Sequence, residues 1–337
     1  MTTLVVTVTE IMRYRGAIGQ WSWVLHRITG LGVVLFLTLH VIDTSWAVFY
    51  PEKYVEAIAS YQSPLFTIGE FALVACVVYH AINGLRIILL DYRPHLWQYQ
   101  QRAAYIVLAV TGLILVPVFI LMFSHVLNFY SSGEPVLPLT EVIVAQLPFL
   151  AGFVVAGVAA LFYSVVHGAI AGDTESKAGG RPAGSSIERF WWSFMRISGL
   201  LIVPLVFGHL AMMHVLQGVF DITAQGYTIV GTGGIINESG TAVEFVANRW
   251  NLLVGGVAIW RLYDFALLAL VVTHGFNGLR YVLTDYTMSS PLLRRASIYL
   301  CVIAGVVLLM LGTGALLGTI DQTAIEMAQQ AAANLHP

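Results

Sequence analysis

Residues 80–92, HAINGLRIILLDY, return in similar form at residues 274–286, HGFNGLRYVLTDY, and this duplication decides the fold. A second pair of similar segments precedes these two: residues 27–40, RITGLGVVLFLTLH, and residues 196–209, RISGLLIVPLVFGH. In both segments of this second pair the histidine follows the arginine by thirteen residues. Identical intervals at two places in one chain indicate an internal repeat.

The repeat lies in a chain that is too apolar for a water-soluble protein. Of its 337 residues, 58% are hydrophobic and 10% are charged, whereas soluble domains have roughly 25% charged residues. The net charge of −2 provides no basic excess to neutralise nucleic-acid phosphates. Cys76 and Cys301 stand singly in apolar runs, which excludes a disulfide framework, a thiolate zinc site and a cysteine-ligated iron–sulfur cluster. We therefore predict an all-α integral membrane protein that binds no nucleic acid.

Seven apolar runs are long enough to cross about 30 Å of hydrocarbon as transmembrane helices. They are Ile28–Val48, Phe66–Leu90, Ala103–Phe129, Ile143–Ala171, Ile197–Phe220, Leu262–Leu283 and Ala296–Thr319. The first three and the last three each contain one copy of the repeat, so the fourth is expected to be a single helix connecting two parallel copies. The predicted units are residues 1–129, a connecting region 130–189 that includes a flexible linker over Gly172–Phe190, and residues 190–337.

The distribution of basic residues predicts the direction of the chain across the membrane. Arginines gather before the first span and in the loops after spans two, four and six. The other loops are rich in Asp and Glu, with Lys53, Arg249 and Arg261 as their bases. Because basic loops face the cytoplasm, we predict that the N-terminus lies inside and the C-terminus outside, with lipid around the spans.

Four histidines, His40, His80, His209 and His274, lie in predicted spans at repeated positions. One such histidine is more often a hydrogen-bond partner between helices, but four at repeated positions favour a functional site. Facing helices that each supply an imidazole can hold a six-coordinate haem iron. Depth along the helices pairs His80 with His274 and His40 with His209, which predicts two stacked haems. His214 has no repeat partner, and its five-residue distance from His209 is a poor same-face spacing on an α-helix.

The neighbours of these histidines leave alternatives open. The glycines Gly84 and Gly278 follow a predicted ligand by four residues, and the missing side chain leaves room either for a flat macrocycle or for close helix packing. The arginines Arg86 and Arg280 can pair with haem propionates, or can be the basic residues that the topology requires.

These segments resemble the cytochrome b membrane-anchor subunits of succinate dehydrogenase and fumarate reductase. Residues 25–30, LHRITG, are similar to the first-helix signature of that family. Residues 79–92 resemble the haem-ligand helix of its larger anchor subunit, and residues 274–286 resemble that of the smaller one. The chain therefore resembles a fusion of the two anchors through the fourth span.

The resemblance implies the axial ligands of haem b. It places His80 with His274 at a haem on the cytoplasmic side and His40 with His209 at an outer haem, and the iron of each haem is the only metal it implies. Two haems are expected; with one haem alone, His80 and His274 are the ligands and the deeper pair is not required.

A quinone site near the cytoplasmic surface is also implied by the resemblance, for menaquinone or ubiquinone. The residues assigned to it are Ser22, His26, Arg27, Asp285 and Tyr286. The serine of the family is displaced here, because Trp23 holds its expected position and Ser22 precedes it. Asp43, Glu70 and Asp264, near the outer span ends, belong either to a second site or to a solvated rim.

The function implied by the resemblance is that of the membrane part of a succinate:quinone oxidoreductase, complex II, in a prokaryotic cytoplasmic (inner) membrane. Electrons from succinate arrive through a flavoprotein subunit and an iron–sulfur subunit docked on the basic cytoplasmic face, pass the haems and reduce quinone, or run in reverse. The chain alone should not oxidise succinate, since it lacks a Gly-rich nucleotide fingerprint and cluster cysteines.

Three alternative functions remain open. One is a haem-poor tether that binds quinone in the same complex, and another is a secondary transporter with parallel repeats. The third is the respiratory cytochrome b of quinol:cytochrome c reductases, although that family places two ligand histidines on one helix and each helix here offers one.

Overall fold

The structure, a computed structural model, describes residues 17–131, 186–287 and 290–335, with isolated positions between 133 and 169. Six helices in this part of the chain are long and apolar enough to cross a membrane. They are Ile18–Phe49, Pro64–Tyr92, Pro94–Ser131, Ser186–Leu216, Ile259–Tyr286 and Pro291–Leu317. They agree with six of the seven predicted spans and with an all-α integral membrane protein. The predicted fourth span, Ile143–Ala171, lies outside the described residues except for isolated positions.

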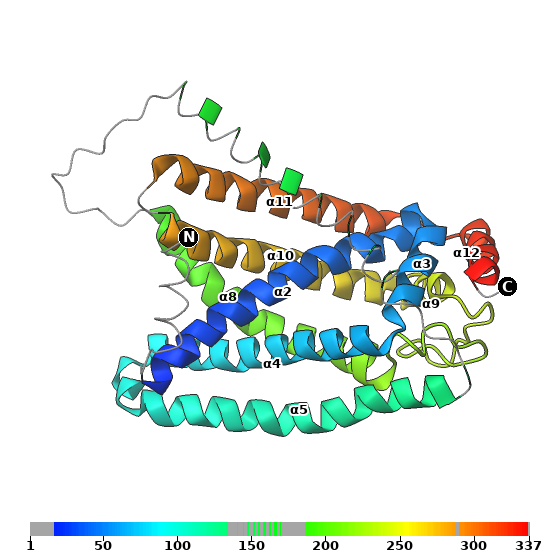
Figure 1. The fold of residues 1–337 in the computed structure, drawn as a ribbon, viewed down its shortest axis with the longest axis horizontal. Helices are drawn as coiled ribbons and strands as arrows, with labels where there is room; N and C mark the ends of the chain where they lie inside the picture. The colour runs from blue at the N-terminus through cyan, green and yellow to red at the C-terminus, as the bar shows by residue number, and fades with distance from the viewer. Residues whose placement is uncertain are drawn as a thin grey trace.

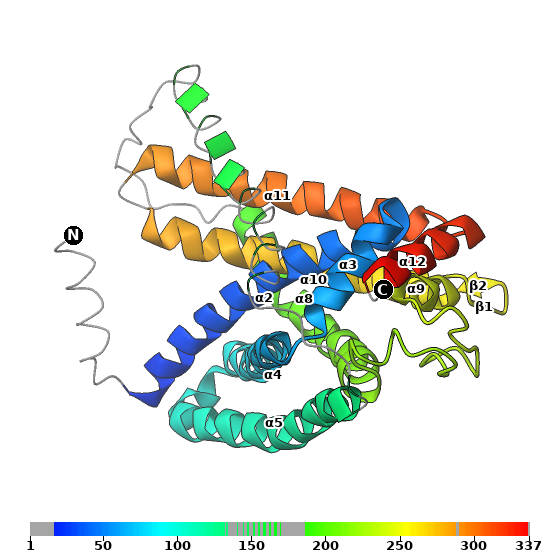
Figure 2. The same ribbon diagram turned by 45° about the vertical axis from the view of Figure 1, so that its right-hand side comes forward.

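Four helices form the centre of the bundle and two lie outside them (Figures 1 and 2). The central helices are α2 (Ile18–Phe49), α4 (Pro64–Tyr92), α8 (Ser186–Leu210) and α10 (Ile259–Tyr286), with α5 (Gln100–Ser131) packed on α4 and α11 (Pro291–Leu317) on α10. Helix α2 crosses the bundle obliquely and contacts α4, α10 and α11, whereas α8 contacts α4 and α10. The four helices that carry the repeated motifs therefore meet in the interior.

Local sequence explains where several helices begin. Ser63 and Ser290 each accept a hydrogen bond from a backbone N–H of the first turn of α4 and α11, at 3.3 Å, and a proline follows each serine. Serine is a good N-cap, and proline fits the first helical position because its missing N–H would be unpaired there. A short 3₁₀ helix, Pro94–Tyr99, leads from α4 into α5.

Two predicted boundaries around the fifth span are wrong. Helix α8 begins at Ser186, inside the segment Gly172–Phe190 that is predicted as a flexible linker. The fifth span is predicted to run to Phe220, but the regular helix ends at Leu210 and a π-helix, Ala211–Leu216, completes it. The first error arises because mean hydropathy marks the apolar middle of a helix and not the polar turn that begins it. The second arises because apolar residues, Val219 and Phe220, continue past the end of the helix.

Short helices form a cap at one end of the bundle. The cap consists of α3 (Pro51–Tyr61), α9 (Ala242–Trp250), α12 (Gln322–Leu335) and residues 217–241, followed by a hairpin of β1 (Leu253–Val254) and β2 (Val257–Ala258). Helices α3, α9 and α12 pack on one another and bury Tyr54, Val243 and Phe245. Burial raises the pKa of the Tyr54 hydroxyl above its ordinary value, so the group stays protonated.

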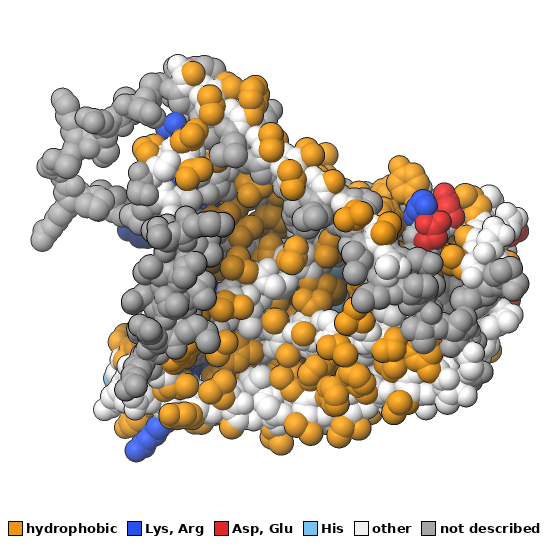
Figure 3. All heavy atoms as spheres, viewed as in Figure 1, with side chains coloured by type: hydrophobic (Ala, Val, Ile, Leu, Met, Phe, Trp, Pro, Cys, Tyr) orange, Lys and Arg blue, Asp and Glu red, His pale blue; other side chains and the backbone are white. Residues whose placement is uncertain are grey.

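Hydrophobic side chains cover much of the face seen in Figure 3. Among the exposed ones are Leu113, Val116 and Ile120 on α5 and Val307 and Met310 on α11. An exposed apolar surface of this extent suits lipid and not water. The two outer helices thus present their apolar side chains to the hydrocarbon, while the interior carries the polar groups.

The contact between α11, α10 and α2 depends on Gly312, where an added Cβ would lie 2.7 Å from Leu268 Cδ2 and 3.1 Å from Val41 Cγ1. The substitution Gly312→Val should overpack this contact and destabilise the protein by about 1–3 kcal/mol, measured as a lower midpoint of thermal unfolding of the purified protein. Gly112→Val on α5 is the matched control, because nothing lies within 4 Å of its added Cβ. Equal midpoints for the two variants would contradict this packing.

Candidate functional site

Among the cavities between the central helices, one lies toward the arginine-bearing ends of α2 and α8 and one lies beneath the cap. The first, the arginine-end cavity, has a volume of about 310 Å³ and is lined by residues from all four central helices. His80 from α4 and His274 from α10 line it, together with His26, Arg27 and Arg196. The fold therefore brings the repeat-equivalent histidines of α4 and α10 to one site.

The hydrogen bonds of these two histidines leave the same ring nitrogen free in each. Nδ1 of His80 lies 3.0 Å from the backbone oxygen of His26, and Nδ1 of His274 lies 2.9 Å from Ser198 Oγ. A carbonyl oxygen accepts only, so Nδ1 of His80 carries the proton and Nε2 keeps its lone pair. Imidazoles that bind iron or zinc have this arrangement, with one nitrogen on the metal and the other N–H held by an acceptor.

Glycines allow both histidine rings to lie close to a neighbouring helix. An added Cβ at Gly30 would lie 2.8 Å from His80 Cε1, and one at Gly199 would lie 3.4 Å from His274 Cε1. Gly84 and Gly278 also line the cavity, and an added Cβ there would meet ordinary van der Waals neighbours at 3.7 and 3.6 Å. Gly30 and Gly199, in the first and fifth predicted spans, therefore make the tighter contacts. Sequence reasoning gave these two glycines no packing role.

Several buried hydrogen-bond donors near this end of the bundle have no partner among the described residues. They are His26 Nδ1, Asn83 Nδ2, Asn277 Nδ2, Nε and Nη1 of Arg86 and Nη2 of Arg280. An unpaired buried donor is costly, and of these residues only His26 lines the arginine-end cavity. Arg86 and Arg280 do not line the cavity, whereas Arg27 and Arg196 do, so these two arginines are better placed than the predicted pair to meet propionates.

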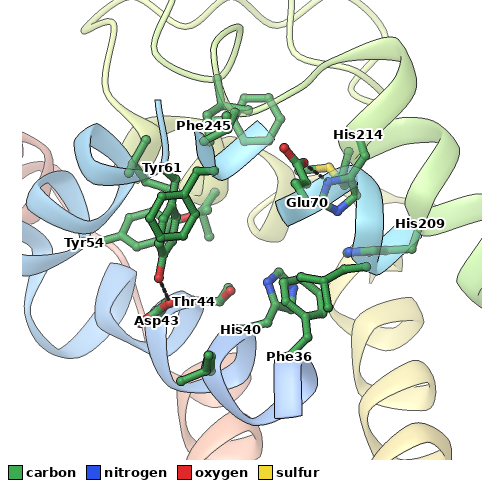
Figure 4. A pocket seen from close by; sticks show the side chains of 18 of the residues that line it. Phe36, His40, Asp43, Thr44, Tyr54, Tyr61, Glu70, His209, His214 and Phe245 are labelled. Carbon is green, nitrogen blue, oxygen red and sulfur yellow. Dashed lines mark hydrogen bonds and ion pairs between the residues drawn. The ribbon is translucent and has the colours of Figure 1, made fainter. Parts of the chain in front are cut away.

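The second cavity, the cap-end cavity, has a volume of about 280 Å³ and contains three histidines (Figure 4). The ring centroids of His40 from α2 and His209 from α8 are 5.9 Å apart. His214 lies 6.0 Å from His209, and its Nδ1 is 2.5 Å from Glu70 Oε1. The expectation that His214 points away from His209 is therefore wrong. His214 lies in the π-helix, where a five-residue interval returns to the same face.

Acidic side chains complete the wall of the cap-end cavity. Asp43 accepts a hydrogen bond from the Tyr61 hydroxyl, and Asp264 accepts one from Trp250 Nε1 at 2.9 Å. With Glu70, these are the three acids that the sequence places near the outer span ends. Each acid has a protein partner and lines a cavity, which distinguishes this arrangement from a solvated rim.

Arg249 of α9 is the basic residue of this cavity, and sequence reasoning missed it. Only 4% of its surface is exposed. Its Nη1 donates to Val230 O at 2.6 Å, and its guanidinium lies 4.1 Å from the ring centroid of Trp260. Burial lowers the pKa of Arg249 below its ordinary value. The sequence feature that could have indicated Arg249 is that it is one of the few basic residues in the acidic loops.

Most of the predicted quinone-binding residues lie together at the arginine end. Arg27 forms an ion pair with Asp285, and its guanidinium lies 4.1 Å from the ring centroid of Trp23 and 6.0 Å from that of Tyr286. His26 instead stacks on His80, with ring centroids 3.9 Å apart.

Ser22 does not join this group. Its side chain is buried against α4, where Oγ lies 3.0 Å from the Tyr79 hydroxyl and donates to Asn83 Oδ1 at 2.8 Å. These contacts show what the serine hydroxyl does in this chain, because they connect α2 to α4 inside the bundle.

The ion pair of Arg27 has a counterpart formed by the equivalent residues of the other copy. Arg196 donates to Asp91 Oδ2 from Nη2 at 2.6 Å and from Nε at 3.1 Å, and its guanidinium lies 4.0 Å from the ring centroid of Trp192. Each repeated arginine thus pairs with the aspartate in the last turn of the histidine helix of the other copy. The sequence revealed the repeat, but the exchange of partners emerged only from the fold.

These features define a class of protein: a helical membrane protein whose central helices enclose histidine-lined cavities. Residues 7–109 and 183–313 match the family described as succinate dehydrogenase/fumarate reductase transmembrane subunit. The chain belongs to this family, and it is a membrane-anchor subunit. The two matching stretches contain the two copies of the repeat.

Individual relatives support this assignment. The chain is 38% identical over 112 residues to the succinate dehydrogenase 2 membrane subunit SdhC of Mycobacterium tuberculosis, which covers 33% of this chain and 82% of the relative. It is 30% identical over 99 residues to a succinate dehydrogenase hydrophobic membrane anchor subunit of Halobacterium salinarum, covering 29% of this chain and 75% of the relative. A like-named subunit of Archaeoglobus fulgidus is 32% identical over 82 residues, 24% of this chain and 70% of the relative. No solved structure matches the chain.

The two exchanged ion pairs should differ in their importance for stability. The Asp91 side chain is 19% exposed and that of Asp285 is 52% exposed. Asp91→Asn, which leaves Arg196 half-buried without its carboxylate, should destabilise the protein by about 1.5–3 kcal/mol. Asp285→Asn, the matched variant, should cost about 1 kcal/mol or less. Thermal unfolding of both purified variants measures the difference, and a larger loss for Asp285→Asn would refute this ranking.

Proposed function

We propose that this chain is the haem b membrane anchor of a succinate:quinone oxidoreductase and that it carries electrons from an iron–sulfur subunit to quinone. Family membership supports the complex, and the two cavities support the haems. His80 and His274 would hold one haem in the arginine-end cavity, and His40 and His209 would hold a second in the cap-end cavity. The observation that carries the proposal is the pair of Nδ1 hydrogen bonds, which leave Nε2 of both His80 and His274 free for iron.

The residues of this chain would position and shield the haems. A bound haem supplies one-electron transfer, while the protein sets its place and potential. Arg27 and Arg196 line the arginine-end cavity and can neutralise propionate carboxylates. Arg249 lines the cap-end cavity, where its buried guanidinium lies among acids and histidines. Apolar side chains of the four central helices keep water from the imidazoles.

Quinone would bind at the arginine end, beside the arginine-end cavity. There Arg27 can donate to a quinone carbonyl oxygen, and Asp285 keeps its guanidinium in place. Tyr286 is exposed and lies on the same side, so its hydroxyl can meet a head group arriving from the lipid. Because Ser22 is fully engaged with Tyr79 and Asn83, the head group would be held without it.

The topology and partners belong to the same proposal. Seven spans, arranged as two parallel three-helix copies joined by the fourth, would place the N-terminus inside and the C-terminus outside. Most arginines of the described helices gather at one end, and the acids of the cap lie at the other, which supports this direction. The flavoprotein and iron–sulfur subunits would then dock on the arginine end. The relatives from bacteria and archaea support a prokaryotic cytoplasmic membrane.

Haem stoichiometry tests the electron-transfer role. The purified complex should contain two haems b per chain by pyridine haemochrome, and His40→Ala or His209→Ala should remove one of them by deleting an axial ligand. His80→Ala or His274→Ala should remove the other. His125→Ala is the control, because His125 is an intramembrane histidine bonded to Asp221 and Val215 outside both cavities. An intact wild-type complex without haem would leave a quinone-binding tether as the function.

Substitution of Arg27 tests the quinone site separately. Arg27→Leu should lower succinate:quinone reductase activity by about 10–100-fold, the loss expected for one hydrogen bond from a charged donor. Reduction of a water-soluble dye at the flavoprotein should be unchanged. Arg93→Leu provides the control, since Arg93 lies at the same end but lines neither cavity. Equal losses with quinone and dye would place Arg27 in assembly of the complex and not in quinone binding.

A further inference from the structure

Ser198 of α8 is almost completely buried, at 1% exposure, and makes two hydrogen bonds. Its Oγ lies 2.6 Å from the backbone oxygen of Phe194 and 2.9 Å from Nδ1 of His274. The first contact is within α8, and the second crosses to α10. A serine that bonds the preceding turn needs no further partner, so the second contact is an addition to local helix chemistry.

The directions of these two bonds follow from the number of protons. A serine hydroxyl has one proton, and the carbonyl of Phe194 can only accept it. The oxygen of Ser198 is then the acceptor for His274, which must carry its proton on Nδ1. The hydroxyl therefore selects one tautomer of His274 and turns the lone pair of Nε2 toward the arginine-end cavity.

The equivalent hydroxyl of the first copy, Thr29, does not have this role. It donates to Leu25 O at 2.7 Å and lies 3.5 Å from Nδ1 of His80. Nδ1 of His80 is closer to a backbone oxygen, that of His26, at 3.0 Å. A backbone acceptor remains when the threonine side chain changes, whereas Ser198 is the one acceptor that meets His274 within the part of the chain that the structure describes. The two copies thus hold their histidines by different means.

We propose that Ser198 is a positioning residue for His274, and that its hydroxyl fixes the tautomer of that imidazole and tunes its basicity as an iron ligand. The proposal rests on the proposed function, because it takes His274 as an axial ligand. An N–H that donates to an acceptor makes the opposite nitrogen a stronger donor to the metal. A stronger donor stabilises ferric iron relative to ferrous iron and lowers the reduction potential.

A packing role for Ser198 makes a different prediction. Ser198 is small and precedes Gly199, and small residues also allow helices to approach closely. If size alone mattered, alanine would replace serine without effect and threonine would disturb the site. If the hydroxyl matters, threonine should preserve the function and alanine should lose it.

The test uses the assembled complex carrying Ser198→Ala, Ser198→Thr or the control Thr29→Val. Redox titration gives the midpoint potential of the haem that His80→Ala removes, and low-temperature EPR gives its low-field g value. Ser198→Ala should raise the potential by an amount equal to a threefold to tenfold change in the ferric-to-ferrous ratio, tenfold being about 59 mV for one electron. The Ser198→Ala complex should also lose this haem to a haem-binding competitor roughly 10–100-fold more readily than the wild type. Ser198→Thr and Thr29→Val should resemble the wild type.

The outcomes separate this proposal from the proposed function. If the wild-type complex contains no haem at the level of His80, the proposed function is refuted before any serine variant is compared. A haem-loaded Ser198→Ala complex with wild-type potential, g value and haem retention overturns the role of Ser198 alone. Equal changes in Ser198→Ala and Thr29→Val also overturn it, because loss of either hydroxyl would then act through general packing. If Ser198→Thr fails to assemble, the comparison of Ser198→Ala with Thr29→Val still decides.

Discussion

A polar group inside the hydrocarbon has no water to bond, so it must find its partner within the protein. This constraint explains how the bundle is held together. Ser22 on α2 bonds to Tyr79 and Asn83 on α4, Arg196 on α8 pairs with Asp91 on α4, and His214 meets Glu70. Each contact joins two helices that apolar packing alone would leave free to slide or rotate. The polar residues of the spans therefore determine which helices are neighbours, and the apolar residues face lipid.

Many of the exceptions to this rule lie in the repeated motifs. Buried donors without a described partner occur on four repeated residues, Asn83, Arg86, Asn277 and Arg280. Both asparagines stand three residues after a histidine that lines the arginine-end cavity. Because an unpaired buried donor is costly, a ligand with acceptor oxygens next to the motif would stabilise these groups.

Sequence reasoning predicted the repeat and the six described spans, and the structure brings together the histidines that were paired by depth, His80 with His274 and His40 with His209. These depend on periodic features that one chain displays twice. It missed His214, since a five-residue interval separates side chains on an α-helix and only a local π-helix reunites them. It also missed Arg249 and the cap, because short amphipathic helices between spans have the composition of loops. Sequence reasoning also did not predict where the Ser22 side chain points, because this depends on contacts with α4 that no local sequence pattern indicates.

The exchanged ion pairs bear on why the chain contains two copies. Arg27 pairs with Asp285, and Arg196, its equivalent, pairs with Asp91, the equivalent of Asp285. Reciprocal contacts of this kind are those of a twofold interface, in which residue i meets residue j and residue j meets residue i. One copy alone would leave its arginine and its aspartate without a partner in the membrane. The stretches that are similar to the three relatives span most of each relative but a third or less of this chain. An anchor of that size would therefore need a second subunit to complete the same two pairs, which this chain supplies by covalent connection.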